Sequence, residues 1–251
     1  MKISITKNNM RLPVRIIAST CFCLAIWSVL SIIVDNSYFL PGVHETFLRL
    51  VDLLGTGRFY LAILFSVARV IMGLLLGIFI GVALAILSHL FAWADYLISP
   101  IVSIMKATPI ATIILILWFT FTDTSLAVFV VFLMVTPIVW QNVYDGFKSI
   151  PKELVEVCEI YQFSFRKKMK ILVFPALMKY FIPAVITSIG LAWKAEIAAE
   201  IMTYSNIGRS IQDFKTLHYD TASVFAWAVV IVVLSLILES GARYFLRRVR
   251  V

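Results

Sequence analysis

The stretch FIPAVITSIGLAWKAEIAAEIM, residues 181–202, decides which solvent this chain is built for. It is apolar along nearly its whole length, and a helix needs about 20 such residues to cross a bilayer. It nevertheless carries Lys194, Glu196 and Glu200. Because a charge at the bilayer centre costs roughly 2.5–3.5 kcal/mol, these side chains are expected to face protein or a polar pathway rather than lipid.

The composition extends this interpretation to the whole chain. Of its 251 residues, 61% are hydrophobic and only 14% are charged, whereas about 25% of the residues in a soluble domain are charged. A soluble core cannot hide so much apolar surface, so the excess must face lipid. The sequence therefore predicts an all-α, polytopic integral membrane protein, with residues 1–251 forming a single transmembrane domain.

Six apolar runs are long enough to cross a bilayer as helices. They are Val14–Val34, Tyr60–Leu87, Tyr96–Phe121, Ser125–Val143, Leu172–Met202 and Thr221–Phe245. Pro100 and Pro109 interrupt the third run, which is tolerated where neighbouring helices satisfy the freed carbonyl groups. The first run is too long for the apolar part of a signal peptide, so we expect a retained span. Residues 60–245 would then form the core.

The positive charges predict the orientation of these spans. With the N-terminus inside, sixteen lysines and arginines fall in inner segments and four in outer segments. Cytoplasmic segments of membrane proteins carry such an excess. Both termini are therefore expected to be cytoplasmic, and the net charge of +8 reflects topology rather than a nucleic-acid partner.

Three glycines recur in the second run. GLLLGIFIG, residues 73–81, places Gly73, Gly77 and Gly81 four residues apart. This spacing puts them on one stripe of a helix, where a second helix can approach closely. The pattern predicts helix packing and indicates no chemistry.

A polar segment from Asn142 to about Lys170 interrupts the apolar runs on the inner side. Pro151 suits the first turn of a helix, and apolar residues then recur at helical spacing. These apolar residues are Leu154, Val157, Cys158 and Tyr161, and they alternate with Glu153, Glu156 and Glu159. The pattern predicts an amphipathic helix at residues 151–165. It suits either a helix lying on the membrane surface or one that docks in a groove of a cytoplasmic protein.

The segment ELVEVCEIYQFSFRKKMKILVFPALMKYFIP, residues 153–183, resembles the EAA loop of membrane subunits of bacterial ABC importers. Residues 156–158 stand at the Glu-Ala-Ala position, Gln162 at the Gly position and residues 174–175 at the Leu-Pro position. The first Glu and the last Pro match, whereas the alanines and the glycine do not. Residues 65–87 and 100–119 resemble further segments of this permease family, and residues 188–211 are similar to a segment of its nitrate, sulfonate and taurine branch.

The resemblance implies the permease (MetI-like) fold of a binding-protein-dependent importer in the bacterial inner membrane, with a cytoplasmic coupling helix. The implied partners are a cytoplasmic ATP-binding subunit, an external substrate-binding protein and a second permease copy, expected to form a homodimer in membrane lipid. The residues implied to couple to the ATPase are Glu153, Glu156, Val157, Cys158, Gln162, Ser164 and Pro175. The chain contains no G-x-x-x-x-G-K-[ST] phosphate loop, so ATP would bind to the partner and no cofactor to this chain.

Two other classes of protein compete with this interpretation. A membrane enzyme is disfavoured because His44, His89 and His218 are scattered and no metal-ligand spacing occurs; no catalytic or metal-binding residue is predicted. A secondary transporter that uses intramembrane charges for ion coupling stays open as an alternative. The substrate is expected to be a small solute, anionic or organic, of the sulfonate, taurine or nitrate kind.

The charges of the opening stretch suggest where that solute passes. The pathway candidates are Trp193, Lys194, Glu196 and Glu200. Glu196 and Glu200 share one helix face, whereas Lys194 lies about 200° from Glu196, so a local Lys–Glu pair is not expected. The charges either pair with neighbouring helices or line the pathway, and Arg69 is expected to reach the membrane surface or pair near the start of its own span.

Overall fold

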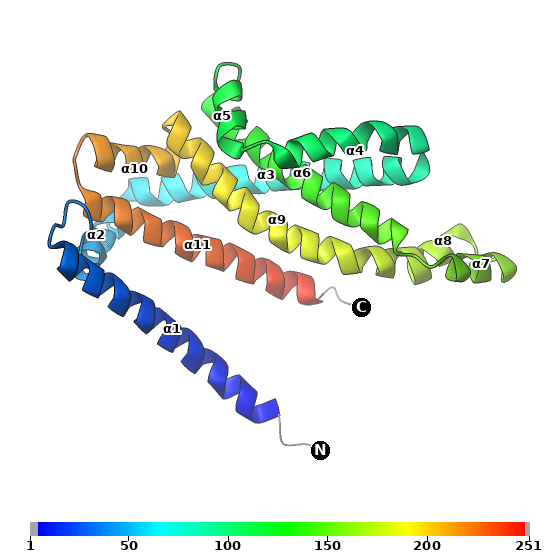
Figure 1. Ribbon diagram of the computed structural model, residues 1–251, viewed down its shortest axis with the longest axis horizontal. Helices are drawn as coiled ribbons and strands as arrows, with labels where there is room; N and C mark the ends of the chain where they lie inside the picture. The colour runs from blue at the N-terminus through cyan, green and yellow to red at the C-terminus, as the bar shows by residue number, and fades with distance from the viewer. Residues whose placement is uncertain (1–4, 249–251) are drawn as a thin grey trace. The chain divides into compact units, whose positions relative to one another are not determined.

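The computed structural model describes residues 5–248, which form helices joined by turns (Figure 1). The helices are α1 Ile5–Val34, α2 Val43–Leu54, α3 Gly57–Leu90, α4 Ala92–Ala107, α5 Ile110–Trp118, α6 Asp123–Lys148, α7 Lys152–Ile160, α8 Phe165–Lys168, a π-helical turn Met169–Val173, α9 Phe174–Thr203, α10 Asn206–Thr216 and α11 Thr221–Arg248. No strand occurs in this part of the chain. The predicted all-α class is confirmed.

The chain divides into two compact units. The first comprises Met1–Tyr60 and Ile211–Val230, and the second comprises Leu61–Ser210 and Ile231–Val251. In the second unit α6 and α9 pack along each other, and Figure 1 shows the chain leaving α6, passing through α7 and α8, and returning along α9.

The predicted glycine stripe lies where α3 meets α6. An added Cβ atom would lie 2.6 Å from Val131 Cβ at Gly73, 2.7 Å from Val135 Cβ at Gly77 and 2.9 Å from Val139 Cβ at Gly81. No side chain fits at these distances, so the glycines allow the two helices to approach closely. The contact positions rise together along both helices, and α3 and α6 therefore run in the same direction.

This parallel packing decides the number of membrane crossings. Among the described residues, five helices are long and apolar enough to cross a membrane, and α4 with α5 passes the same test as a pair bent by 97°. Two parallel spans need a return crossing between them, and α4 with α5 is the segment between α3 and α6. The bent pair is therefore the third of six spans.

The sequence predicts a third span at residues 96–121 that Pro100 and Pro109 interrupt; the structure places this span at residues 92–118 and breaks it at Pro109 alone. Pro109 has no backbone N–H and restrains Thr108 to an extended conformation (φ −77°, ψ 125°), so α4 ends before it and α5 begins after it. Pro100 lies inside α4 without ending that helix. The fifth span also begins earlier than Leu172, because the helix is continuous from Phe165. Its π-helical turn ends at Val173, two residues before Pro175, which removes one α-helical hydrogen bond.

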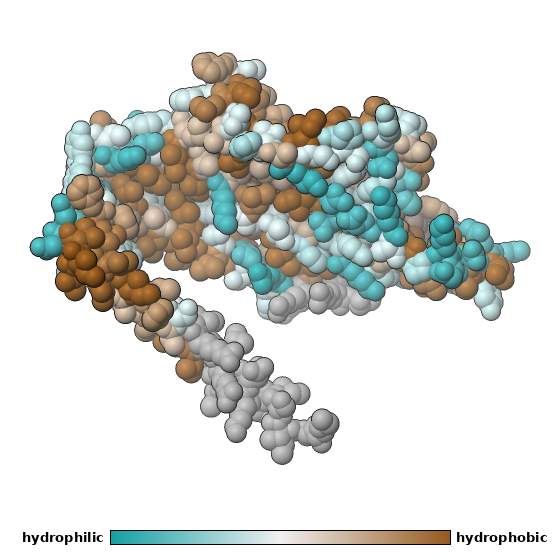
Figure 2. Space-filling model, in the orientation of Figure 1, coloured by the Kyte–Doolittle hydropathy of each residue, from teal (hydrophilic) through white to brown (hydrophobic). Residues whose placement is uncertain are grey.

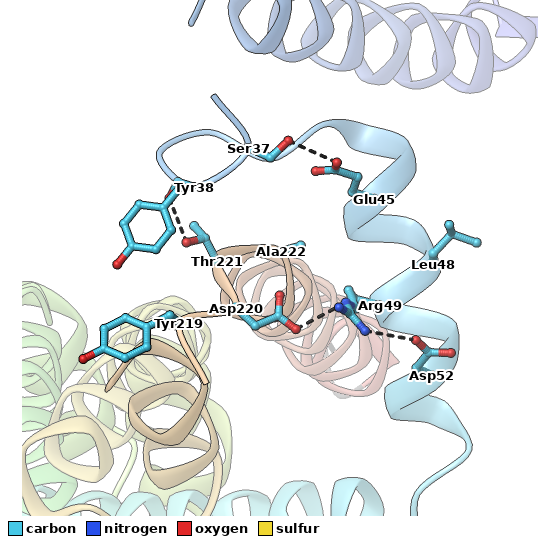
Figure 3. Close-up of a pocket in the computed structure, with 10 residues that line it drawn as sticks. All are labelled: Ser37, Tyr38, Glu45, Leu48, Arg49, Asp52, Tyr219, Asp220, Thr221 and Ala222. Carbon is cyan, nitrogen blue, oxygen red and sulfur yellow. Dashed lines mark hydrogen bonds and ion pairs between the residues drawn. The ribbon is translucent and has the colours of Figure 1, made fainter. Parts of the chain in front are cut away.

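The first unit contains a polar pocket of about 480 Å³ beside α2 (Figure 3). Arg49 Nε lies 3.2 Å from Asp220 Oδ2, and its Nη1 lies 3.7 Å from Asp52 Oδ2. The lining residues are Ser37, Tyr38, Glu45, Leu48, Arg49, Asp52, Tyr219, Asp220, Thr221 and Ala222. The hydroxyl of Thr221 donates to the carbonyl of Tyr38 at 2.8 Å, which joins the start of α11 to the loop before α2.

Candidate functional site

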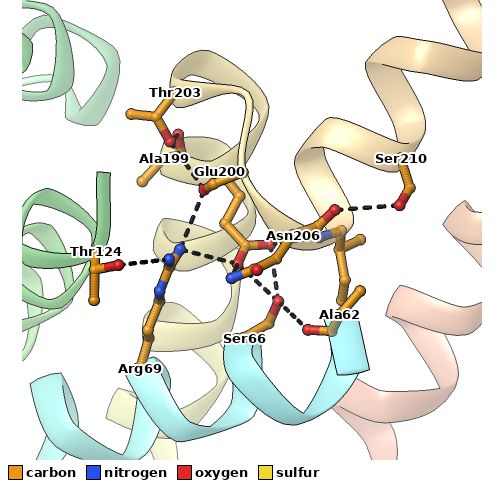
Figure 4. Close-up of polar contacts among 11 residues, drawn as sticks. Ala62, Ser66, Arg69, Thr124, Ala199, Glu200, Thr203, Asn206 and Ser210 are labelled. Carbon is orange, nitrogen blue, oxygen red and sulfur yellow. Dashed lines mark hydrogen bonds and ion pairs between the residues drawn. The ribbon is translucent and has the colours of Figure 1, made fainter. Parts of the chain in front are cut away.

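Glu200, near the end of α9, is fully buried and accepts hydrogen bonds from four groups (Figure 4). Ser66 Oγ donates at 2.7 Å, Asn206 Nδ2 at 2.9 Å and the backbone N–H of Ile207 at 3.2 Å. Arg69 Nη1 lies 3.4 Å from Oε1 and forms an ion pair. A buried charge requires this kind of pairing, so the carboxylate of Glu200 belongs to a satisfied network.

Arg69 joins that network to two further segments. Its Nη1 donates to Ser205 Oγ at 3.1 Å and its Nη2 donates to Thr124 Oγ1 at 2.8 Å. The guanidinium therefore ties α3 to the end of α9 and to the start of α6. Only 8% of Arg69 is exposed, so of the two expectations for this residue the structure shows the pairing and not the reach to the surface.

The turn between α9 and α10 is built around the same carboxylate. Tyr204 and Asn206 adopt the left-handed conformation, with φ of 60° and 42°. A Cβ atom added to Gly208 would overlap the backbone carbonyl of Glu200. The start of α10 can therefore lie against α9 only because residue 208 is glycine.

The other pathway candidates of α9 lie on different sides of the helix. Trp193 is buried, and its indole N–H donates to the carbonyl of Ile231 in α11 at 3.1 Å. Glu196 is fully buried, and neither carboxylate oxygen has a hydrogen-bond partner among the described residues. Lys194 is exposed and has no ion pair with any described residue. Of the four candidates, Lys194 is therefore the one on the outer surface of this chain.

The amphipathic helix predicted at residues 151–165 is shorter in the structure. The helix at residues 151–165 divides into α7, which ends at Ile160, and α8, which begins at Phe165. Gln162 between them has a φ of 49°, in the left-handed region that interrupts a helix and favours glycine. This residue stands at the Gly position of the EAA pattern, so the backbone keeps the turn although the glycine is absent.

Most residues predicted to couple to the ATPase are exposed. Those on the surface are Glu153, Glu156, Val157, Gln162, Ser164 and Pro175, whereas Cys158 is buried. Leu154, Ile160 and Tyr161 add exposed apolar area to α7. Figure 2 shows hydrophilic side chains gathered over α7 and α8, with apolar ones between them. Glu159 and Lys168, 3.6 Å apart, connect the two short helices.

No group of three or more metal-ligating side chains occurs among the described residues. The family model described as "Binding-protein-dependent transport system inner membrane component" matches residues 73–251. The chain belongs to this family. It is a multi-pass membrane permease of the ABC importer class, and this assignment favours the importer over a secondary transporter.

Two curated relatives of the permease are named for anions. The putative aliphatic sulfonates transport permease of Bacillus subtilis is 25% identical over 229 residues, covering 90% of this chain and 82% of the relative. The bicarbonate transport system permease of Synechococcus elongatus is 28% identical over 144 residues, covering 57% and 52%. Both relatives fit the branch that the sequence resembled.

Solved structures show the same fold. The inward-facing MetNI methionine ABC transporter matches with a TM-score of 0.63 at 14% identity, covering 74% of this chain and 94% of that one. An amino acid ABC transporter with histidines matches with a TM-score of 0.62 at 13% identity, covering 73% and 90%. The predicted MetI-like permease fold is confirmed.

Sequence reasoning missed the partners of Glu200 in this permease. Ser66, Thr124 and Asn206 are ordinary small polar residues, and nothing in their local sequence marks them. The available signal was Arg69, because an arginine inside a span requires a partner and two glutamates occur in another span. That signal predicts a pair but does not say which glutamate forms it.

Proposed function

We propose that this permease imports a small anion through an ATP-driven complex. The complex contains a cytoplasmic ATP-binding subunit that binds ATP, an external substrate-binding protein and a second permease copy. Relatives named for aliphatic sulfonates and for bicarbonate support an anionic substrate, since both solutes carry negative charge. In this proposal the ATP-binding subunit binds the ATP, and the permease acts with no cofactor and no catalytic residue of its own.

The exposed surface of α7 carries this proposal. The helix lies between spans α6 and α9 and presents Leu154, Val157 and Ile160 to the outside of the chain. Apolar side chains on a short polar connection fit a groove of a partner protein, whose hot spots are buried apolar anchors. Because α7 is joined to one span at each end, a movement of the bound ATPase would move both spans.

The order of the spans along the chain supports an assignment of membrane sides. Because three spans lie between α2 and α7 in the sequence, we infer that these two helices emerge on opposite sides of the membrane. With α7 and both termini in the cytoplasm, as the lysine and arginine distribution favours, the pocket beside α2 faces outward. We place the docking of the external binding protein on this polar surface, which includes Arg49, Asp52 and Asp220.

Charge reversal in α7 tests the coupling. In the purified complex in liposomes, Glu156→Lys should abolish substrate-stimulated ATP hydrolysis while the permease still folds and assembles. Lys215→Glu, a charge change of equal size and opposite sign on an exposed residue of α10, serves as the control and should leave the stimulation unchanged. Normal coupled transport by Glu156→Lys would sink the assignment of α7.

The number of permease copies is tested by native mass spectrometry of the same complex. We expect two copies of this chain, since six helices are too few to enclose a wide pathway. A single copy beside two ATP-binding subunits would refute the homodimer.

A further inference from the structure

The outward side of α9 differs from a lipid-facing surface. Beyond the first turn of this helix, the exposed residues are Lys179, Pro183, Thr187 and Lys194. At about 100° per residue these four residues fall within an arc of about 80°. We call this set the cationic arc.

Lipid is excluded as the neighbour of the cationic arc. Exposed residues of the spans that meet lipid are large and apolar, such as Leu75 and Phe79 in α3 and Leu236 in α11. No large apolar side chain is exposed between residues 175 and 203. A lysine exposed to lipid at mid-bilayer costs roughly 2.5–3.5 kcal/mol. If the arc faced lipid, Lys194 would incur this cost, and no exposed large apolar side chain of α9 would offset it.

Gly190 adds an independent observation. It lies near the centre of the arc, and a Cβ atom added there would meet nothing within 4 Å. Packing inside this chain therefore does not require glycine at residue 190, in contrast to Gly77 against Val135. The absence of a side chain leaves open space on the surface of the arc.

The two lysines of the arc carry unneutralised charge. Neither Lys179 nor Lys194 has an ion pair with a described residue. The acidic residues of α9 cannot pair with these lysines, because Glu200 forms an ion pair with Arg69 on the buried side of the helix and Glu196 is buried on the same side. The arc is therefore a positively charged strip that attracts anions.

We propose that the cationic arc lines a water-filled anion pathway in which Lys194 and Lys179 are successive stations. This inference rests on the proposed function and adds Lys179, Thr187 and Gly190 to the pathway. Fifteen residues of helix separate the lysines by about 22 Å, too far for one small anion to bind both. The hydroxyl of Thr187 lies roughly midway, about 10 Å from the level of Lys194 and 12 Å from that of Lys179.

The positions of the stations along α9 give the direction of travel. Lys194 is nearer the end that joins α10, and Lys179 is nearer the end that joins α7. An anion released outside therefore meets Lys194 first and Lys179 last. Glycine at residue 190 keeps the space between the stations free.

Cysteine labelling of the complex in membrane vesicles tests the pathway without knowledge of the substrate. Cys21, Cys23 and Cys158 are first replaced by alanine, and single cysteines are introduced as Thr187→Cys and, for a lipid-facing control, Leu236→Cys. The probes are an anionic sulfonatoethyl and a cationic trimethylammonioethyl methanethiosulfonate. We expect T187C to react with the anionic probe roughly ten-fold faster than with the cationic probe, and L236C to react with neither.

Lys194→Gln added to T187C should reduce that preference several-fold, since one of the two charges is gone. If T187C is as unreactive as L236C, the arc is not water-filled and the inference is overturned. The inference is also overturned if T187C reacts equally fast with both probes and Lys194→Gln does not change these rates. A disulfide between T187C residues of two copies without labelling indicates a dry subunit contact, which overturns the pathway and leaves the permease function intact.

The proposed function can fail separately. If T187C shows the charge preference but the complex takes up neither aliphatic sulfonate nor bicarbonate, the anion pathway stands and the proposed substrate class falls. If the complex takes up either anion but T187C does not show the charge preference, the proposed substrate class stands and the pathway along the cationic arc falls.

Discussion

Helices α3 and α9 both cross the membrane and both bury charged side chains, yet the side chains that they turn outward differ. α3 turns Leu64, Leu75 and Phe79 outward and buries Arg69. α9 buries Glu196 and Glu200 and turns its lysines outward. The exposed side chains of a span indicate what surrounds it. For α3 they indicate lipid, and for α9 they indicate, by our proposal, an aqueous pathway.

The largest effect is expected where the two helices meet. Glu200→Ala leaves Arg69 buried without its carboxylate and should destabilise the permease by about 3–5 kcal/mol. The loss is measured as the drop in unfolding temperature in detergent. The double variant R69M/E200L should recover part of it, because no charge then remains buried alone. A melting temperature of E200A equal to that of the unaltered permease would mean that the pair contributes nothing.

An exchange of side chains between outward surfaces tests the comparison directly. Leu236→Lys puts a charge on the lipid side of α11 and should cost roughly 2.5–3.5 kcal/mol. Lys194→Leu should leave stability unchanged within about 0.5 kcal/mol but should lower anion uptake. Both are measured as the yield of inserted, folded protein and as uptake in vesicles. Equal destabilisation by the two variants would mean that the outward sides of α9 and α11 have the same surroundings.

The buried glycines are expected to give a smaller loss. Gly77→Ala forces a Cβ atom against Val135, and overpacking of this kind costs about 1–3 kcal/mol. The matched control is Gly190→Ala, which meets open space and should cost less than about 0.5 kcal/mol. Unfolding in detergent separates the two; a larger loss for G190A would show that the outward arc is packed.

The smallest effect lies outside the spans, at Gln162. Glycine adopts the left-handed backbone conformation of residue 162 without the steric cost that glutamine incurs, but it loses more conformational entropy on folding. Gln162→Gly should therefore stabilise the permease by less than about 1 kcal/mol. Gln162→Ala keeps the penalty and should give no gain. Because this substitution lies in neither α3 nor α9, its effect on the free energy of unfolding is the reference against which the variants of the three preceding predictions are compared. A loss of stability in Q162G would mean that the side chain, not the backbone, matters.

The sequence could predict the membrane class, the spans and an amphipathic helix within residues 151–165, because apolar runs and amphipathic spacing are local features. It also predicted that Gly73, Gly77 and Gly81 share one stripe, since that follows from helix geometry alone. It could place Lys194 and Glu196 on different sides of a helix. It could not say which of those sides is buried, because that depends on contacts with residues far away in the chain.

Three features depended on information that no local pattern holds. The pair of Arg69 and Glu200 joins residues 131 positions apart. Pro109 predicted a break in the third span, but the 97° bend depends on how α5 packs against α6 and α9. Gln162 ends α7 in a left-handed conformation that its side chain does not favour, so the turn is imposed by the segments around it.

Two glycines of this chain have opposite genetic consequences. Every substitution of residue 208 introduces a Cβ atom that overlaps the carbonyl of Glu200, so each missense allele there should disturb the turn into α10. A Cβ atom added at residue 190 meets nothing within 4 Å, so alanine there should leave folding intact. In a library grown under selection for uptake, alleles at 208 should disappear together with the protein, whereas alleles at 190 should disappear, if at all, with the protein still present in the membrane.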